Sequence, residues 1–387
     1  MIRSLGRTPA TALALSLVAS VAGGALALPT ASAKPAAPVT STVAGTDSDG
    51  DSLPDAWETQ GYDADGNGTI DVDLPAMGAN PQRKDVFVEM DYMQGRLPRT
   101  TAFDRIVQSF ASAPVSNPDG TTGITIHLDA GSAGGAAHNL GGGNQVTYDA
   151  NLSPASRETN AIKAKNFASV RSSVFYYMLW ADDYDRSCSS GLALGIPADT
   201  FIVTMGPRCA WSPTEDMQVG TFLHELGHGL GLKHGGTDHV NYKPNYLSVM
   251  NYTFQFGGVP LAAGGSSFSY SDTAAVSLNE SALAEPTGLG ATASKYRTAW
   301  YCGTTKQTSA GAASNPIDWN CDNDTVDNPV ATDINRSGSQ TTLTAQDNWD
   351  NIVFGGGLVG GAGSRVATTT DGLRELTKRE WAQLHKH

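Results

Sequence analysis

Three histidines and one glutamate lie together in a short stretch, residues 224–234. Histidines four residues apart on a helix project from the same face, so His224 and His228 can present two imidazoles to one metal ion. Gly231 allows the left-handed backbone angles of a sharp turn, which would carry His234 back towards the same ion. Three histidines that leave a fourth position open for water are typical of catalytic zinc, so the sequence predicts a zinc site.

Glu225 follows the first histidine directly, so its side chain leaves the helix on a different side from the imidazoles. This position suits a general base acting on water better than a metal ligand. The start of the helix is signalled by Ser212 as N-cap, Pro213 at the first helical position and Glu215 three residues after the cap. We expect the helix to run to about Leu230. The alternative, histidines with ordinary surface or core roles, requires this spacing to arise by chance.

The stretch resembles the signature of the metzincin clan of zinc metallopeptidases, H-E-x-x-H-x-x-G-x-x-H, which it matches in full. A methionine turn follows as in that clan, with Met250 sixteen residues after His234. The resemblance implies that Met250 is a hydrophobic floor beneath the histidines and that Tyr252 can approach the zinc and stabilise an oxyanion. Alternatively, Tyr252 is a core aromatic with a hydrogen-bonded hydroxyl. The residue that follows the third histidine distinguishes the better-known branches of the clan, and Gly235 at this position matches none of them.

The resemblance covers roughly residues 84–256 and implies hydrolysis of a protein or peptide substrate. Zinc would polarise the scissile carbonyl and lower the pKa of its water, and Glu225 would carry the proton to the leaving amine. The strand near residues 200–205 would be the rim on which an extended substrate pairs. We expect a zinc metallopeptidase. Two alternatives stay open: a secreted calcium-binding adhesion or matrix module with an inactive domain, against which Glu225 argues, and a zinc hydrolase of a non-peptide amide.

Strand and helix patterns alternate around this segment, and the sequence becomes glycine-rich after Asn251. The expected fold class is α+β: a metzincin-like catalytic domain with a mixed twisted sheet, an active-site helix and a loop-rich C-terminal subdomain. We expect a calcium-binding segment (46–83), a catalytic core (84–256) and the C-terminal subdomain (257–387). Strands are predicted at 85–92, 123–129, 173–180 and 200–205, and helices at 101–112, 160–169 and, exposed and packed by one face, 371–384.

Two acidic loops near the N-terminus space their oxygen side chains as calcium ligands do, and they resemble EF-hand and thrombospondin type 3 loops. Ser52 stands where such loops prefer glycine, whereas Gly68 fits, so the flanking helices of an EF-hand are not expected. A structural calcium role is predicted; the alternative is a solvated acidic linker. A weaker cluster holds Asp322, Asp324, Asp327 and residues 333–338. The predicted calcium ligands are Asp47, Asp49, Asp51, Asp55, Glu58, Asp63, Asp65, Asn67 and Asp71.

The formal net charge of −13 is concentrated in these acidic stretches. Residues 47–73 hold nine acidic residues and no basic one, and residues 322–350 hold six acidic residues and one basic one. The rest of the chain is therefore nearly neutral. A chain without a basic surface lacks the charge that binds phosphate backbones, so we expect no nucleic-acid partner.

The N-terminus has the pattern of a secretory signal peptide. Arg3 and Arg7 precede an apolar stretch that ends in the small-residue run Ala31-Ser32-Ala33. We expect a signal peptide at 1–33 and a flexible leader at 34–45; the alternative is a membrane anchor. The expected product is a secreted, extracellular monomer without membrane contact after signal removal.

The four cysteines of an exported chain are more consistent with disulfides than with metal ligands or nucleophiles. Pairs Cys188–Cys209 and Cys302–Cys321 would each close a loop of about twenty residues, a constraint of roughly 3 kcal/mol in the chain-entropy model. The other two connectivities remain open.

Overall fold

The computed structural model describes residues 45–361 and 375–384. The predicted signal peptide and all but the last residue of the predicted leader lie outside these residues, so both remain predictions. All described residues belong to one compact unit, Thr40–His387. No helix among them is both long enough and apolar enough to cross a membrane. The predicted domain boundaries within this unit also remain predictions.

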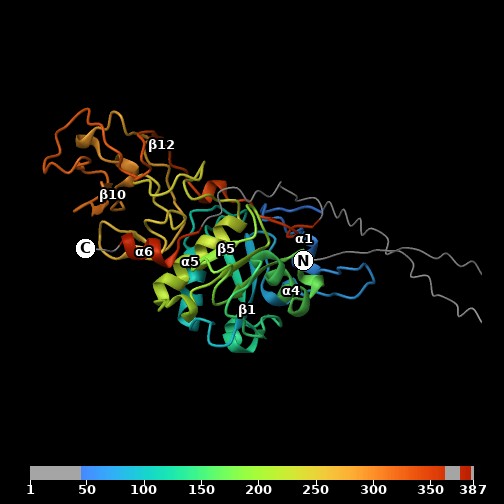
Figure 1. Ribbon diagram of the computed structural model, residues 1–387. Coiled ribbons are helices and arrows are strands. Elements are labelled where there is room, and N and C mark those ends of the chain that lie inside the picture. The colour runs from blue at the N-terminus through green and yellow to red at the C-terminus, as the bar shows by residue number, and fades with distance from the viewer. Residues whose placement is uncertain (1–44, 362–374, 385–387) are drawn as a thin grey trace, which may run out of the picture. The chain divides into compact units, whose positions relative to one another are not determined.

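A six-stranded mixed sheet forms the centre of the unit (Figure 1). Its order is β2-β1-β4-β6-β5, with β3 paired to the end of β1. The pairings are parallel except that β5 runs antiparallel to β6. This arrangement confirms the α+β class with a mixed sheet. The strands are β1 (Asp85–Met93), β2 (Thr125–Asp129), β3 (Gln145–Val146), β4 (Phe175–Trp180), β5 (Gly191–Ala193) and β6 (Thr200–Val203).

Both faces of the sheet are covered, which explains why β4 is apolar and buried along its whole length. Successive side chains of a strand point to opposite faces. Val88 of β1 packs with Phe103 of α3 and Phe222 of α5, whereas the preceding Phe87 belongs to a second cluster with Ala155 of α4. The α-helices are α1 (Asp55–Gln60), α2 (Leu74–Met77), α3 (Thr100–Ala111), α4 (Ala155–Asn166), α5 (Glu215–Gly229) and α6 (Lys378–Leu384).

The region after α5 consists mainly of loops joined by short antiparallel strand pairs, as the glycine content predicts. A third buried cluster holds it together and includes Trp300 and Trp319, whose ring centroids lie 5.5 Å apart. The strand pairs are β7 (Val259–Pro260) with β8 (Ser266–Ser267), β9 (Leu278–Asn279) with β12 (Thr342–Leu343), and β10 (Ala299–Cys302) with β11 (Thr305–Thr308). The 3₁₀ turns are Gly131–Gly134, Ala136–His138, Ser169–Arg171, Pro207–Cys209, Glu285–Thr287, Ala291–Ala293 and Trp349–Asn351.

The cysteines pair as Cys188–Cys209 and Cys302–Cys321, which confirms the predicted connectivity. Among the described residues there is no free cysteine. The first disulfide lies directly before β5, at the side of the sheet where the candidate site is found.

The predicted capping of α5 is wrong. Thr214, not Ser212, is the N-cap, because its hydroxyl accepts a hydrogen bond from the Met217 amide (3.2 Å). The helix therefore begins at Glu215, whose carboxylate pairs with Arg105 of α3 (3.0 Å) instead of closing a capping box. The helix predicted at 160–169 is also displaced, since α4 spans Ala155–Asn166.

The C-terminal segment also differs from the prediction. Residues 371–374 lie outside the described residues, and α6 begins only at Lys378. The reason is a reciprocal capping box, in which Thr377 Oγ1 accepts from the Glu380 amide (3.2 Å) and Glu380 Oε2 accepts from the Thr377 amide (3.0 Å). Glu375 and Leu376 precede this cap and are buried. The segment is therefore not simply an exposed helix packed by one face.

Candidate metal centre

The three predicted histidine ligands come together at the end of α5. His224 and His228 share one face of the helix, with ring centroids 4.9 Å apart. Gly231 has φ +85° and its amide donates to the His228 carbonyl (3.0 Å), so the chain reverses after the helix. This turn places the His234 ring 4.7 Å from that of His228. All three side chains are buried.

Hydrogen bonds to backbone carbonyls orient two of these rings. His224 Nδ1 lies 2.9 Å from the Val249 carbonyl oxygen, and His228 Nδ1 lies 2.8 Å from that of Leu232. Because a carbonyl only accepts, both Nδ1 atoms carry the proton. Both Nε2 atoms then present lone pairs to the centre, which is how histidine binds a metal.

Glu375 lies at the point where the three imidazoles converge, and the sequence prediction missed it. Its Oε2 is 3.0 Å from His224 Nε2 and 3.3 Å from His234 Nε2, and its Oε1 is 3.3 Å from His228 Nε2. The side chain is 1% exposed. No local pattern marks this residue, because it stands alone and 141 positions after His234.

These four side chains fit a zinc ion. His228 Nε2 and His234 Nε2 lie only 3.1 Å apart. One ligand atom from each of the four residues lies within 4.8 Å of the others, so the group could hold a metal ion, and a set of imidazole nitrogens with a carboxylate oxygen suits zinc.

The electrostatics agree with that reading. Burial lowers the pKa of His234 to about 4, so this imidazole is neutral, as a metal ligand must be. Burial by itself would raise the pKa of the Glu375 carboxyl, but the surrounding histidines, His234 first, hold that pKa well below its usual range.

Glu225 is fully buried and lies against the edge strand. A Cβ atom on Gly191 of β5 would come within 2.4 Å of Glu225 Oε1, so glycine makes room for this carboxylate. Burial, and then the nearby Glu375 carboxylate, raises the pKa of Glu225 well above its usual value.

Met250 and Tyr252 both lie at the histidines. Met250 is buried beneath α5, where a Cβ on Gly227 would meet its Sδ at 2.3 Å. The Tyr252 ring centroid lies 4.7 Å from that of His234, and its hydroxyl donates to Glu375 Oε2 (3.2 Å). Tyr252 therefore has features of both interpretations drawn from the sequence. Its ring is buried like a core aromatic, and its hydroxyl reaches the group of histidines.

The predicted substrate rim is wrong. The strand at residues 200–205 is β6, which is paired on both sides, with β4 and with β5. The edge of the sheet beside α5 is β5 and the residues before it. A substrate backbone can pair only with an edge that has free hydrogen-bonding groups, so β6 cannot take that role, and β5 is the edge strand on this side of the sheet.

The first predicted calcium loop folds around Asp47. Its Oδ1 accepts from the Gly50 amide (2.7 Å) and its Oδ2 from the Ser52 amide (3.0 Å). Ser52 has φ +74°, the conformation for which such loops prefer glycine. Asp55 accepts from the Ser48 amide (2.8 Å) and closes the loop. The carboxylates at loop positions 1, 3 and 5 lie within 4.8 Å of one another.

A buried group of carboxylates lies behind this loop. Oxygens of Asp51, Glu58 and Asp85 lie within 4.8 Å of one another, and each residue is 2% exposed. Neither Glu58 oxygen has a hydrogen-bond partner among the described residues. Burial, with the charge of neighbouring aspartates, raises the pKa of Asp51 to about 8 and that of Glu58 to about 9. Such a group fits a bound cation, and Asp85, at the start of β1, is a candidate ligand that the sequence prediction missed.

The second loop repeats the first with an exposed ligand set. Asp63 Oδ1 accepts from Gly66 and Oδ2 from Gly68, both at 2.7 Å, and Asp71 accepts from the Ala64 amide (2.8 Å). Oxygens of Asp63, Asp65 and Asp71 lie within 4.8 Å of one another. Asn67 Oδ1 accepts from the Thr69 amide within the same loop.

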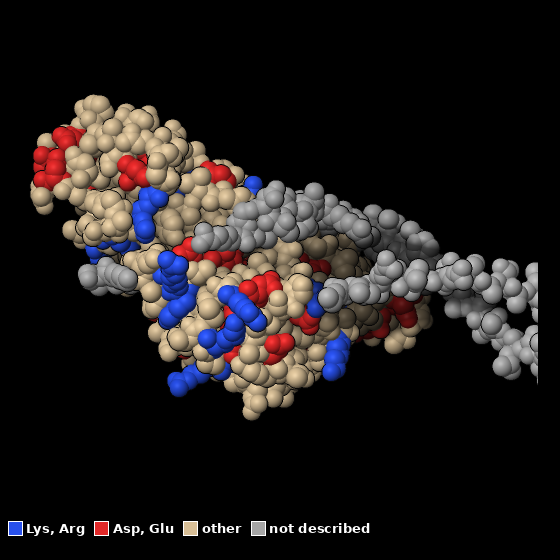
Figure 2. Space-filling view, in the orientation of Figure 1, with Lys and Arg blue, Asp and Glu red and all other residues tan. Residues whose placement is uncertain are grey.

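The C-terminal acidic cluster forms two loops of the same kind. Asp333 Oδ2 accepts from the Gly338 amide (2.7 Å), and Asp318 accepts from the amides of Asp322 (3.1 Å) and Asn323 (2.9 Å). Asp318 was missed, although the alternating oxygen side chains that begin with it were a readable signal. Figure 2 shows acidic side chains gathered at the outer end of the part that holds β10 (Figure 1). Calcium binding here remains a prediction. Asp324, Asp327 and Asn335 lie in or beside these loops.

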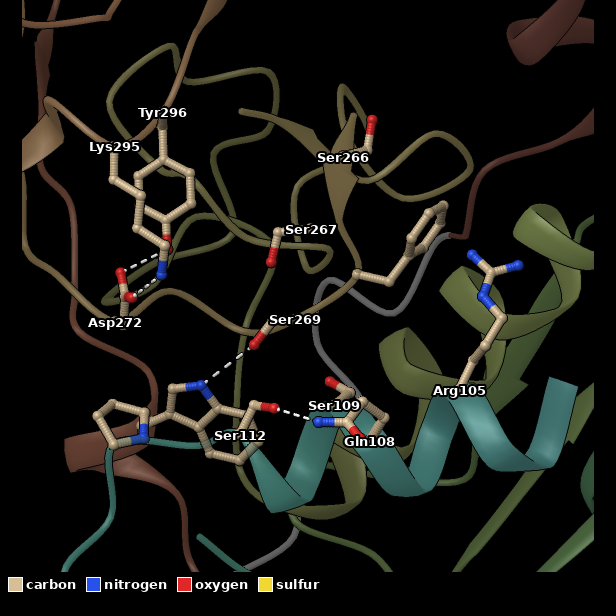
Figure 3. A pocket seen from close by; sticks show the side chains of 13 residues that line it. Arg105, Gln108, Ser109, Ser112, Ser266, Ser267, Ser269, Asp272, Lys295 and Tyr296 are labelled. Carbon is tan, nitrogen blue, oxygen red and sulfur yellow. Dashed lines mark hydrogen bonds and ion pairs between the residues drawn. The ribbon is translucent and has the colours of Figure 1, made fainter. Parts of the chain in front are cut away.

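A cavity of about 290 Å³ lies away from the metal centre, between α3 and residues 266–272 (Figure 3). Its lining is mixed polar and apolar, and its two basic residues have acidic partners. Lys295 pairs with Asp272 (2.9 Å), and Arg105 pairs with Glu215. The cavity contains no group of metal-ligating side chains.

Three comparisons with known proteins add no relative: no protein family model, no curated protein and no solved structure matches the chain.

Proposed function

We propose that this chain is a secreted zinc-dependent peptidase stabilised by calcium. The observation that carries the proposal is the convergence of His224, His228 and His234 Nε2 atoms beside a buried glutamate, Glu225. Two of the histidines are held in the metal-binding tautomer, and Met250 supports the helix from below.

The three histidines would hold the zinc ion, which supplies positive charge that polarises a peptide carbonyl and makes water acidic. Glu225 takes a proton from the attacking water as the oxygen adds to the carbonyl carbon. It then gives that proton to the amide nitrogen as the carbon–nitrogen bond breaks, so one water is consumed and an acid and an amine are formed. The Tyr252 hydroxyl can donate to the oxygen that gains negative charge.

The β5 edge favours an extended peptide over a small amide as substrate, because backbone groups along an edge bind a chain rather than a single bond. A zinc hydrolase of a non-peptide amide would need no such edge. The acidic loops at residues 47–73 support a stabilising role for calcium. Asp51 and Glu58 of the first loop lie in one carboxylate group with Asp85 at the start of β1, so a bound ion would join the loop to the sheet.

The first test replaces the proposed base. We expect Glu225→Gln to keep stoichiometric zinc while losing roughly 10²–10⁴-fold in casein or peptide hydrolysis. Each substitution is measured in the wild-type chain and in a chain that also carries Glu375→Ala, because the Glu375 carboxylate lies at the position where a substrate would bind. Glu215→Gln, the same change in the first turn of α5, is the matched control and should keep activity. Full activity in Glu225→Gln would contradict the assignment.

A further inference from the structure

The C-terminal segment at residues 375–378 places a carboxylate among the three histidines, where a substrate would have to bind. Glu375 contacts all three histidines at 3.0–3.3 Å and accepts from the Tyr252 hydroxyl at 3.2 Å. Its carboxylate therefore takes the fourth corner, which in a catalytic zinc site belongs to water and the substrate carbonyl.

Backbone hydrogen bonds align this segment with the edge of the sheet. The Ser190 amide donates to the Leu376 carbonyl (3.0 Å), and the Lys378 amide donates to the Cys188 carbonyl (2.9 Å). Ser189 and Thr377 form an antiparallel bridge. On its other side, Ser190 already pairs with the chain beyond β6, since its carbonyl accepts from the Thr204 amide (2.7 Å). Residues 375–378 therefore add to the outer edge as an extended peptide does.

Side chains fasten the segment on both sides of the backbone pairing. Leu376 is 1% exposed and belongs to the same buried cluster as the apolar residues of α5. Beyond it, the Lys378 ammonium lies 4.6 Å from the ring centroid of Trp211, and the Trp381 ring packs near those of Trp211 and Phe256.

We propose that Glu375 is a fourth protein ligand of the zinc site and that residues 375–378 occupy the substrate cleft, so that the full-length chain is latent. The inference rests on the proposed peptidase function and names its regulation. It also gives the substrate class: an extended peptide with a leucine-sized apolar side chain at the position that Leu376 fills. Activation requires only that this segment leave the cleft, because the three histidines, Glu225 and Tyr252 are already in place.

The test uses full-length Glu375→Ala and the isosteric Glu375→Gln. If the site is open in fewer than a tenth of wild-type molecules, we expect both variants to hydrolyse peptides at least about tenfold faster than wild type. The matched control is Glu380→Gln, which keeps an acceptor for the Thr377 cap and does not contact the histidines. It should behave as wild type. Thermal unfolding of each variant verifies that it is folded.

A second readout does not depend on activity. With Co²⁺ in place of zinc, loss of the carboxylate ligand should change the visible absorption of both Glu375 variants but not of Glu380→Gln. A synthetic peptide with the sequence of residues 375–381 should inhibit Glu375→Ala competitively and restore the wild-type Co²⁺ spectrum. Placing Gln at its first position should weaken both effects.

The outcomes separate the two proposals. An altered Co²⁺ spectrum without peptidase activity in any protein keeps Glu375 as a ligand and overturns the peptidase assignment. Peptidase activity that is equal in wild type and both Glu375 variants, with unchanged spectra, overturns latency and keeps the peptidase. A changed spectrum with equal activity identifies Glu375 as a ligand that does not block substrate, which also overturns latency.

Discussion

The chemistry of the centre is set by what each side chain contacts on the side away from the metal position. The carbonyls of Val249 and Leu232 hold protons on the Nδ1 atoms of His224 and His228, and so leave Nε2 free to bind. Gly191 clears the space that the Glu225 carboxylate occupies. Residues with no chemistry of their own therefore decide the protonation and placement of the reactive ones.

The role of Tyr252 can be separated from its packing at this scale. Tyr252→Phe keeps the buried ring and removes the hydroxyl that reaches the centre. In the Glu375→Ala background we expect kcat to fall about a hundredfold, the magnitude of losing one oxyanion donor, with KM and zinc content little changed. Tyr246→Phe is the control, since that buried hydroxyl bonds the Lys233 carbonyl and Asn348 instead. Equal kcat in Tyr252→Phe and its parent would make Tyr252 a core aromatic only.

The position of α5 depends on glycines that let two chain segments approach it closely. A Cβ on Gly227 would meet Met250 Sδ at 2.3 Å, and a Cβ on Gly220 would meet the Gln255 carbonyl oxygen at 1.8 Å. The helix and the segment around the methionine turn are thus in close contact at two positions, Gly227 with Met250 and Gly220 with Gln255. This contact fixes the height of the histidines above Met250.

Gly220→Ala tests this packing. The substitution has two opposing effects on stability, a gain in helix propensity and a clash with the Gln255 carbonyl. Alanine favours a helix interior over glycine by about 1 kcal/mol, but overpacking typically costs about 1–3 kcal/mol and a backbone carbonyl cannot rotate aside. We expect the clash to win and the melting temperature to fall by several degrees. Gly257→Ala, where a Cβ meets nothing within 4 Å, is the control and should be nearly neutral. A Gly220→Ala melting temperature at or above that of the control would contradict the packing argument.

At the scale of the whole molecule, the buried carboxylates tie the N-terminal loops to the central sheet. Asp51 and Glu58 come from the loop segment and Asp85 from the start of β1, and the Asp85 amide donates to Asp51 Oδ2 (2.7 Å). A cation among them would therefore link two regions that are separate in the sequence.

This arrangement predicts a pH dependence of the metal-free protein. The folded chain raises the pKa of Asp51 to about 8 and that of Glu58 to about 9, whereas an unfolded chain releases these protons near pH 4. The folded state then binds more protons, so its stability is greatest at low pH and is lost as pH rises through that window. In EDTA, the melting temperature should fall between about pH 5 and 8.

Calcium should replace those protons and reduce this fall, because it binds the ionised carboxylates. Glu58→Gln provides the matched comparison: in EDTA it should lose less stability on raising the pH, and it should gain less from calcium than wild type. Calorimetry with zinc or calcium added back separately tells the sites apart. Full recovery with zinc alone would contradict a calcium site.

The sequence by itself determined what depends on local spacing. His224, Glu225 and His228 follow the helical period, Gly231 provides the turn to His234, and the acidic loops repeat oxygens at fixed short intervals. Each of these is set by backbone geometry over a few residues, so each is readable before folding. The alternating strand and helix patterns favoured an α+β fold, and the short separations of the cysteines favoured the two disulfides that the structure forms.

Only the tertiary structure decided which distant residues complete the sites. Glu375 reaches the histidines because residues 376–378 pair with the edge before β5, and no local pattern encodes that pairing. Asp85 joins the carboxylates of the first predicted calcium loop only because β1 begins beside it. The same reason makes β5 and not β6 the edge of the sheet, since a strand becomes an edge through what pairs with it and not through its own residues.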